Sequence, residues 1–266
     1  MRRLVALLAL VAAPAALAAG PTPGTVQGGE GLSLGSARYT AVKHGARTDL
    51  VLWRGGEVAR TVSVAGNWGI PLVSYGGEVG GGSHDGGPLV LAQADFPRTT
   101  LRKVSRFLVF DTRRLGAAPT QVRLRGDFAF DALAPHGRML YLIQHVSSTD
   151  VTHYRVRGYD LRTGTLLKRV IADKRQASWV MKGMPMRRAT SADGRWEYTL
   201  YSQPDNYPFV HALDTIAGTA VCIGIPWDWT KDLGPVSMVL RNGKLVVHVG
   251  AAQKRYAIDT RTLRLG

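Results

Sequence analysis

The chain contains 266 residues, of which 45% are hydrophobic and 20% are charged, and its formal net charge is +15. Its one cysteine, Cys222, excludes an intramolecular disulfide, so packing alone must hold the fold together. The positive charge favours anionic partners such as acidic envelope polymers, lipid headgroups or nucleic acid, although scattered basic residues also fit a compositional bias.

The N-terminus has the pattern of a secretory signal. Arg2 and Arg3 precede an apolar stretch at residues 4–13, and an Ala-Leu-Ala triplet follows at 16–18. We therefore predict a signal peptide at 1–18, a linker at 19–30, and a secreted, periplasmic or cell-envelope location. A membrane anchor is the alternative, but the apolar run is short for a bilayer span, and no later stretch predicts one.

Four segments share a turn that ends in Gly and is followed at once by an apolar run. Asp-Gly and Asn-Gly favour two-residue hairpins, because both central positions of a type I′ turn need a positive φ. The four glycines are 51, 57 and 49 residues apart. The segments are SHDGGPLVLAQ (83–93), APHGRMLYLIQ (134–144), SADGRWEYTLY (191–201) and LRNGKLVVHVG (240–250).

A second signal recurs with a similar period. In this signal a predicted strand ends in Asp and a turn follows. The Asp side chain can accept backbone N–H groups in an Asx turn, which explains why such a turn would be repeated. The aspartates Asp111, Asp160, Asp214 and Asp259 are 49, 54 and 45 residues apart. Their segments are FLVFDTRRLG (107–116), YRVRGYDLRTG (154–164), FVHALDTIAG (209–218) and RYAIDTRTL (255–263).

Two offset signals with this period predict a repeated unit of four antiparallel strands. Such a sheet has two apolar faces, which similar sheets arranged radially would cover. We predict an all-β fold, a single β-propeller at 31–266 with about five four-stranded blades, and a β-sandwich is the alternative. The expected blades span approximately 31–66, 67–126, 127–172, 187–225 and 235–266.

The blade pattern of SADGRWEYTLYSQPDNYPFVHALDTIAG (191–218) resembles the YVTN/WD-repeat-like β-propellers of bacterial secreted proteins. The resemblance is good over 127–225, weaker over 67–126 and 235–266, and poor before 66. It implies the blade fold and brings no catalytic residues with it.

In a blade of this kind the repeated turns lie on one face of the disc, and the irregular connections on the other face are the predicted binding surface. Residues 168–188 mix basic side chains with Trp and Met, which suits an anionic, partly apolar partner or an ordinary connection tucked under the rim. Two further connections carry tryptophans that suit either sugar stacking or packing. The candidate partner-binding residues are Lys174, Arg175, Trp179, Lys182, Met184, Arg187, Arg188, Trp68, Trp227, Asp228 and Trp229.

Signals for an enzyme are weak. The seven histidines show no metal-binding spacing and no phosphate-binding loop opens a helix, so we predict no catalytic residue, metal or cofactor. The leading hypothesis is a non-catalytic binding or scaffold protein for an anionic protein, glycan or envelope polymer, and nucleic acid fits poorly with export. The alternative is a metal-dependent hydrolase or lactonase with a site in the central channel, where Asp127 and Asp131 are the carboxylates to examine.

Overall fold

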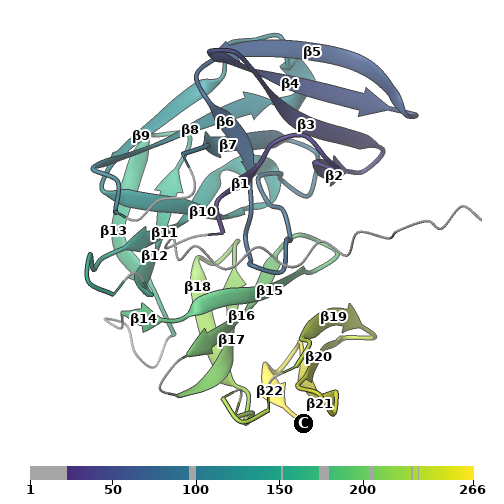
Figure 1. The fold of residues 1–266 in the computed structure, drawn as a ribbon, viewed down its shortest axis with the longest axis vertical. Helices are drawn as coiled ribbons and strands as arrows, with labels where there is room; N and C mark the ends of the chain where they lie inside the picture. The colour runs from purple at the N-terminus through teal and green to yellow at the C-terminus, as the bar shows by residue number, and fades with distance from the viewer. Residues whose placement is uncertain are drawn as a thin grey trace, which may run out of the picture.

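The computed structural model describes residues 23–95, 100–150, 152–173, 180–203, 206–228, 230–232 and 234–266. Over these ranges the chain forms five antiparallel sheets in succession along the sequence (Figure 1). The described helical elements are two short 3-10 turns, η1 (Thr112–Arg114) and η2 (Pro135–Gly137). Among the described residues there is no helix with the length and hydropathy of a membrane span.

Each sheet is built from strands that are consecutive in the sequence and pair as hairpins. The first sheet contains β2 (Leu32–Leu34), β3 (Ala37–His44), β4 (Arg47–Arg54) and β5 (Glu57–Ala65). The second contains β6 (Trp68–Pro71), β7 (Pro88–Gln93), β8 (Val104–Asp111) and β9 (Thr120–Arg125), and β1 (Thr25–Val26) pairs with β6. The third contains β10 (Asp127–Leu133), β11 (Met139–His145), β12 (His153–Asp160) and β13 (Thr165–Ile171), and β14 (Met181–Lys182) pairs with β12.

The last two sheets have four strands each. The fourth contains β15 (Met184–Thr190), β16 (Trp196–Gln203), β17 (Asn206–Asp214) and β18 (Thr219–Gly224). The fifth contains β19 (Ser237–Arg241), β20 (Lys244–Val249), β21 (Lys254–Asp259) and β22 (Arg264–Leu265).

The predicted type I′ turn forms at the Asn-Gly signal but not at Asp85 or Asp193, whose φ is not positive as that turn requires. Asn242 and Gly243 connect β19 to β20 with φ values of 50° and 71°, as a two-residue type I′ hairpin requires. At the other signal, Oδ1 of Asp214 accepts the backbone N–H groups of the second and third residues after it, each at 3.0 Å. The same Asx turn forms at Asp160 and Asp259.

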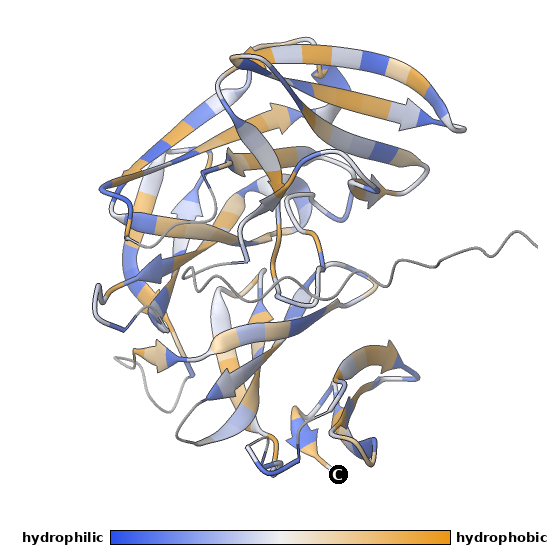
Figure 2. Cartoon of the chain, in the orientation of Figure 1, coloured by the Kyte–Doolittle hydropathy of each residue, from blue (hydrophilic) through white to orange (hydrophobic). Residues whose placement is uncertain are grey.

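Apolar faces of neighbouring sheets pack against each other, and four hydrophobic clusters join the first sheet to the second, the second to the third, the third to the fourth and the fourth to the fifth. Period-two alternation supplies these faces, as when Leu245, Val247 and Val249 of β20 enter the last cluster. Figure 2 shows the resulting alternation of apolar and polar residues along the strands. This stacking confirms the predicted β-propeller, and we number the sheets blades 1 to 5 in chain order.

Over the residues that the structure describes, the propeller is open between blade 5 and blade 1. In the part of the chain that the structure describes, no hydrophobic cluster joins these two blades, and Figure 1 shows them at the two ends of a curved row. Val58 of β5 and Val239 of β19 are each 53% exposed. By strand register both face away from the neighbouring blade, and since Val51 and Val246 on the same faces are buried, the outer face of each terminal blade is exposed in part.

A long segment, residues 72–87, lies between β6 and β7 and crosses the centre of the propeller toward β15. The backbone N–H of Tyr75 donates to the carbonyl of Pro185 at 2.9 Å. Arg187 donates to the carbonyl of Gly76 at 3.0 Å and to that of Val236 at 2.7 Å. The segment therefore ties blade 2 to blade 4, and Arg187 extends the contact to Val236, next to blade 5.

Candidate functional site

The predicted partner-binding residues are not gathered on one exposed surface of the described chain. Lys174, Arg175, Trp179 and Trp229 lie outside the described residues. Lys182 lies on β14, and its Nζ is 3.6 Å from Oδ2 of Asp150. Met184, Arg187 and Arg188 belong to β15. Residues expected in an irregular connection thus form part of a strand at the centre of the propeller.

Arg188 corrects the sequence interpretation most clearly, because it is only 9% exposed. Its guanidinium contacts the carboxylate of Asp131, and its Nη1 lies 3.2 Å from Oε2 of Glu197. Glu197 also accepts a hydrogen bond from Thr190 Oγ1 at 2.7 Å. A buried charge needs such partners, so Arg188 joins blades 3 and 4 and its charge is not offered to a partner at the surface.

The two described tryptophans among the candidates are also interior residues. Trp68 is 9% exposed and packs in the cluster between blades 1 and 2, and Trp227 is 4% exposed and packs between blades 4 and 5. Asp228 is partly exposed, but its Oδ2 lies 2.9 Å from Nζ of Lys231. Hydrogen bonds from Lys231 and Thr230 lower the pKa of Asp228 to about 2. Packing, rather than sugar stacking, accounts for both indoles.

The carboxylates considered for a central metal site are engaged in ion pairs. Asp127 lies 3.5 Å from Arg102 and 3.6 Å from Nδ1 of His145, and Asp131 contacts Arg188. Over the described ranges, no three His, Cys, Asp or Glu side chains are grouped so that they could hold a metal ion.

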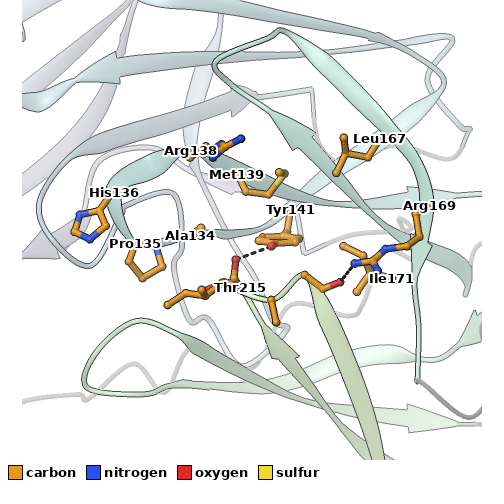
Figure 3. Close-up of a pocket in the computed structure, with 13 residues that line it drawn as sticks. Ala134, Pro135, His136, Arg138, Met139, Tyr141, Leu167, Arg169, Ile171 and Thr215 are labelled. Carbon is orange, nitrogen blue, oxygen red and sulfur yellow. Dashed lines mark hydrogen bonds between the residues drawn. The ribbon is translucent and has the colours of Figure 1, made fainter.

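A cleft of about 400 Å³ opens on the face that carries the repeated turns, between blades 3 and 4 (Figure 3). Blade 3 contributes η2 and parts of β11 and β13, and blade 4 contributes the turn between β17 and β18. The aliphatic part of the lining comprises Pro135, Met139, Leu167, Ile171 and Ile216. Ile216 is 65% exposed, so a large apolar side chain projects into solvent from the rim.

Tyr141 and Thr215 form the base of this cleft. The Tyr141 hydroxyl donates to the carbonyl of Thr215 at 2.6 Å. Burial raises the pKa of Tyr141, and the nearby charge of Asp214 adds to the effect, so the phenol stays protonated and keeps donating. The Thr215 hydroxyl itself turns back to the carbonyl of Arg195 at 2.8 Å. These bonds fix the blade 4 turn against blade 3.

The turn after each repeated Asp explains why the cleft exists here. In blade 3 the residue after the Asp is Leu161, which packs against the cluster between blades 2 and 3. In blade 2 the longer turn places Leu115 in the cluster between blades 1 and 2. Blade 4 has Thr215 instead, and its hydroxyl bonds to backbone rather than filling the groove. A smaller side chain at the joint leaves the space open.

Arginines make the rim of the cleft positive. Arg138 has a side chain that is 66% exposed and lies 3.6 Å from Asp160, and Arg169 donates to the carbonyl of Gly218 at 2.5 Å. Figure 3 shows His136 at one end of the cleft and Arg169 at the other. Each guanidinium has five N–H groups, so donors remain available to bind a carboxylate in the cleft.

The sequence placed the binding surface on the opposite face, so this cleft was missed. One signal could have indicated it. The second residue after the repeated Asp is Arg113, Arg162 or Arg261 in three blades, and it is Ile216 in blade 4. An aliphatic residue at an exposed turn position, among arginines, is the exception that marks the rim.

Comparisons with known proteins identify the fold and not a family. No family model matches the chain, and no curated protein does. Among solved structures, the Swd1 β-propeller domain of Myceliophteria thermophila has a TM-score of 0.50 at 14% identity, covering 88% of this chain and 67% of that domain. Prolyl oligopeptidase B of Galerina marginata has a TM-score of 0.50 at 13% identity, covering 87% and 31%. TolB of Acinetobacter baumannii has a TM-score of 0.44 at 10% identity, covering 85% and 49%. The chain thus spans about half of TolB and a third of the oligopeptidase.

Proposed function

We propose that this chain is an exported binding protein of the YVTN-like propeller type, and that it binds an acidic polypeptide segment in the cleft between blades 3 and 4. The secretory pattern of residues 1–18 supports export, and the repeated blade pattern supports the family. The single observation that carries the binding role is the cleft itself, in which an exposed aliphatic rim adjoins two arginines.

The chemistry of the lining favours a peptide over other anions. Leu167, Ile171 and Ile216 offer aliphatic surface, which suits an apolar side chain better than a sugar or a bare polyanion. Arg138 and Arg169 can pair with carboxylates on either side of that side chain. The volume of about 400 Å³ is that of a small-ligand site and fits one apolar residue with its acidic neighbours.

The net charge of the whole chain supports the same partner. Removal of Arg2 and Arg3 with the signal lowers the formal charge by two, from +15 to +13, and a charge of this size attracts acidic segments over distances beyond direct contact and speeds their association. The cleft then supplies what charge alone does not, namely an apolar contact that selects where on the acidic segment the protein binds.

The test is a random peptide array probed with the mature protein, a double variant Arg138→Gln/Arg169→Gln, and a control double variant Arg123→Gln/Arg125→Gln. The control removes the same charge from exposed positions on β9, away from the cleft. We expect wild type and control to select peptides in which Leu, Ile or Phe is flanked by Asp or Glu. The best peptide should bind the cleft variant at least about tenfold more weakly, which corresponds to about 1.4 kcal/mol. Equal weakening in both double variants, or selection of acidic peptides with no apolar residue, would overturn the proposal.

A further inference from the structure

A second cleft occupies the equivalent joint between blades 4 and 5. Its volume is about 530 Å³, and it lies on the same turn face as the first. Blade 4 contributes the turn between β15 and β16, together with Trp196 and Tyr198 of β16. Blade 5 contributes the turn between β19 and β20, with Arg241 and Asn242, and the turn between β21 and β22, with Arg261.

The two clefts are built from matching positions of the repeat. In HGRMLY and DGRWEY, Met139 and Tyr141 occupy the places that Trp196 and Tyr198 occupy one blade later. On the opposing wall, Thr260 follows the repeated Asp as its counterpart in blade 4 does, and its hydroxyl donates to the carbonyl of Gly243 at 2.8 Å. Leu263 of the same turn packs against the cluster between blades 4 and 5, as Leu115 does between blades 1 and 2, and it does not line the cleft.

The second cleft repeats the chemistry of the first with an aromatic floor. The rings of Trp196 and Tyr198 stack with centroids 6.1 Å apart and an interplanar angle of 14°. Burial, together with the charges of Asp193 and Asp214, raises the pKa of Tyr198 to about 12, so it remains neutral beneath the cleft. The floor is therefore aromatic, and the guanidinium carbon of Arg195 lies over the Trp196 ring, 5.7 Å from its centroid.

Two arginines again border the floor. Arg241 and Arg261 are exposed, and no acidic group of the described chain forms an ion pair with either. The acidic side chain of the lining, Asp193, is used within its own turn, where Oδ1 accepts hydrogen bonds from Ser191 Oγ at 2.5 Å and from the backbone N–H of Arg195 at 3.0 Å. Both guanidinium groups are exposed and keep N–H groups that can bind carboxylates.

We propose that the two clefts are successive subsites for one extended acidic polypeptide that runs along the turn face from blade 3 to blade 5. This inference rests on the proposed function and deepens it. The first subsite takes an aliphatic side chain between Arg138 and Arg169, and the second takes an aromatic or other planar apolar side chain on Trp196 between Arg241 and Arg261. The ligand then carries two apolar residues, each flanked by acidic residues, at a fixed spacing.

The probes are synthetic peptides that contain either one Glu-Leu-Glu module or that module joined to Glu-Phe-Glu by Gly-Ser linkers of increasing length. Binding is measured by fluorescence anisotropy at constant ionic strength. An extended linker adds about 3.3 Å per residue, so we expect affinity to peak at one length and fall beyond it. At that length the two-module peptide should bind about 100-fold more tightly than the single module, because its second contact is intramolecular.

Two double variants separate this inference from the function on which it rests. Arg241→Gln/Arg261→Gln should return the two-module peptide to single-module affinity while leaving the binding of the single module unchanged. Arg138→Gln/Arg169→Gln should instead weaken the single module. If the two-module peptide gains nothing at any linker length, or if the gain survives in Arg241→Gln/Arg261→Gln, the second subsite is refuted and the first stands. If a two-module peptide with Gly in place of Leu and Phe binds equally well, the face recognises bare polyanions and the peptide assignment is refuted. If the single module does not bind wild type at all, the proposed function itself fails.

Discussion

His211 makes the stability of the propeller depend on pH in a way that can be measured. This residue of β17 is buried, lies edge-on to Tyr201 with ring centroids 6.5 Å apart, and has Nδ1 3.6 Å from Sγ of Cys222. Burial lowers the pKa of His211 from 6.5 to about 4, and the positive charge of Arg188 acts in the same direction. The folded protein therefore holds the neutral imidazole where the unfolded chain would bind a proton.

The sign and size of the effect follow from this difference in pKa. Because the folded pKa is the lower one, the contribution of His211 to stability is complete above pH 6.5 and is lost as the pH falls toward 4. Each tenfold difference in proton affinity is worth about 1.4 kcal/mol, so the full loss is about 3 kcal/mol. That is a substantial part of the 5–15 kcal/mol, roughly, that stabilises an ordinary domain.

The assay is urea unfolding followed by tryptophan fluorescence at several pH values from 7.5 to about 4.5, chosen to span the window between the two pKa values. We compare wild type with His211→Phe, which keeps a ring against Tyr201 but cannot be protonated. A matched control, His44→Phe, makes the same change at an exposed site. We expect the free energy of unfolding to fall by about 2–3 kcal/mol less in His211→Phe than in the control. Equal pH dependence in the two variants would refute the reasoning, whatever their stabilities at neutral pH.

Three further predictions concern the described packing and the N-terminus. Arg188→Met should lower the free energy of unfolding by about 3–5 kcal/mol, because it leaves the carboxylates of Asp131 and Glu197 buried without a counter-charge, and a loss below about 1 kcal/mol in urea unfolding would contradict this. Gly194→Ala should lower the melting temperature more than Gly243→Ala. Both positions have a positive φ, near 70°, but a Cβ at 194 would lie 2.3 Å from the Cβ of His84, whereas a Cβ at 243 meets nothing within 4 Å. Equal melting temperatures of the two variants would contradict this prediction. Deleting residues 2–18 should move the protein from the exported to the cytoplasmic fraction of a bacterial host, as measured by immunoblotting, and unchanged export would argue against the signal.

Local devices account for the part of the fold that could be predicted. The Gly hairpin and the Asp-capped turn are each formed by a few consecutive residues, so their sequence signals locate the turns, although not the backbone type of every hairpin, and their period predicts the number of blades. The path of residues 72–87 across the centre depends instead on contacts with Pro185 and Arg187, far along the chain. Nothing in the glycine-rich sequence itself indicates those partners.

The candidate site was predictable only in part, because it depends on which blade surfaces meet. Arg188 reads as one basic residue among several until Asp131, 57 residues earlier, is placed opposite it. The cleft between blades 3 and 4 likewise needs both walls, since Thr215 leaves space only where Met139 and Ile171 line the other side. Burial and joint geometry are properties of the assembled blades, and residue type alone does not reveal them.

The gap between blade 5 and blade 1 changes how this molecule should lose its structure. In a closed ring every blade packs against two neighbours, so the ring unfolds cooperatively as one unit. Here each end blade packs against one neighbour. Unfolding can therefore start at either end and proceed inward, one blade interface after another. Amide protons of β20 and β21 should consequently exchange with solvent sooner than those of β11 and β12. The row of blades should also bend more easily than a closed propeller does.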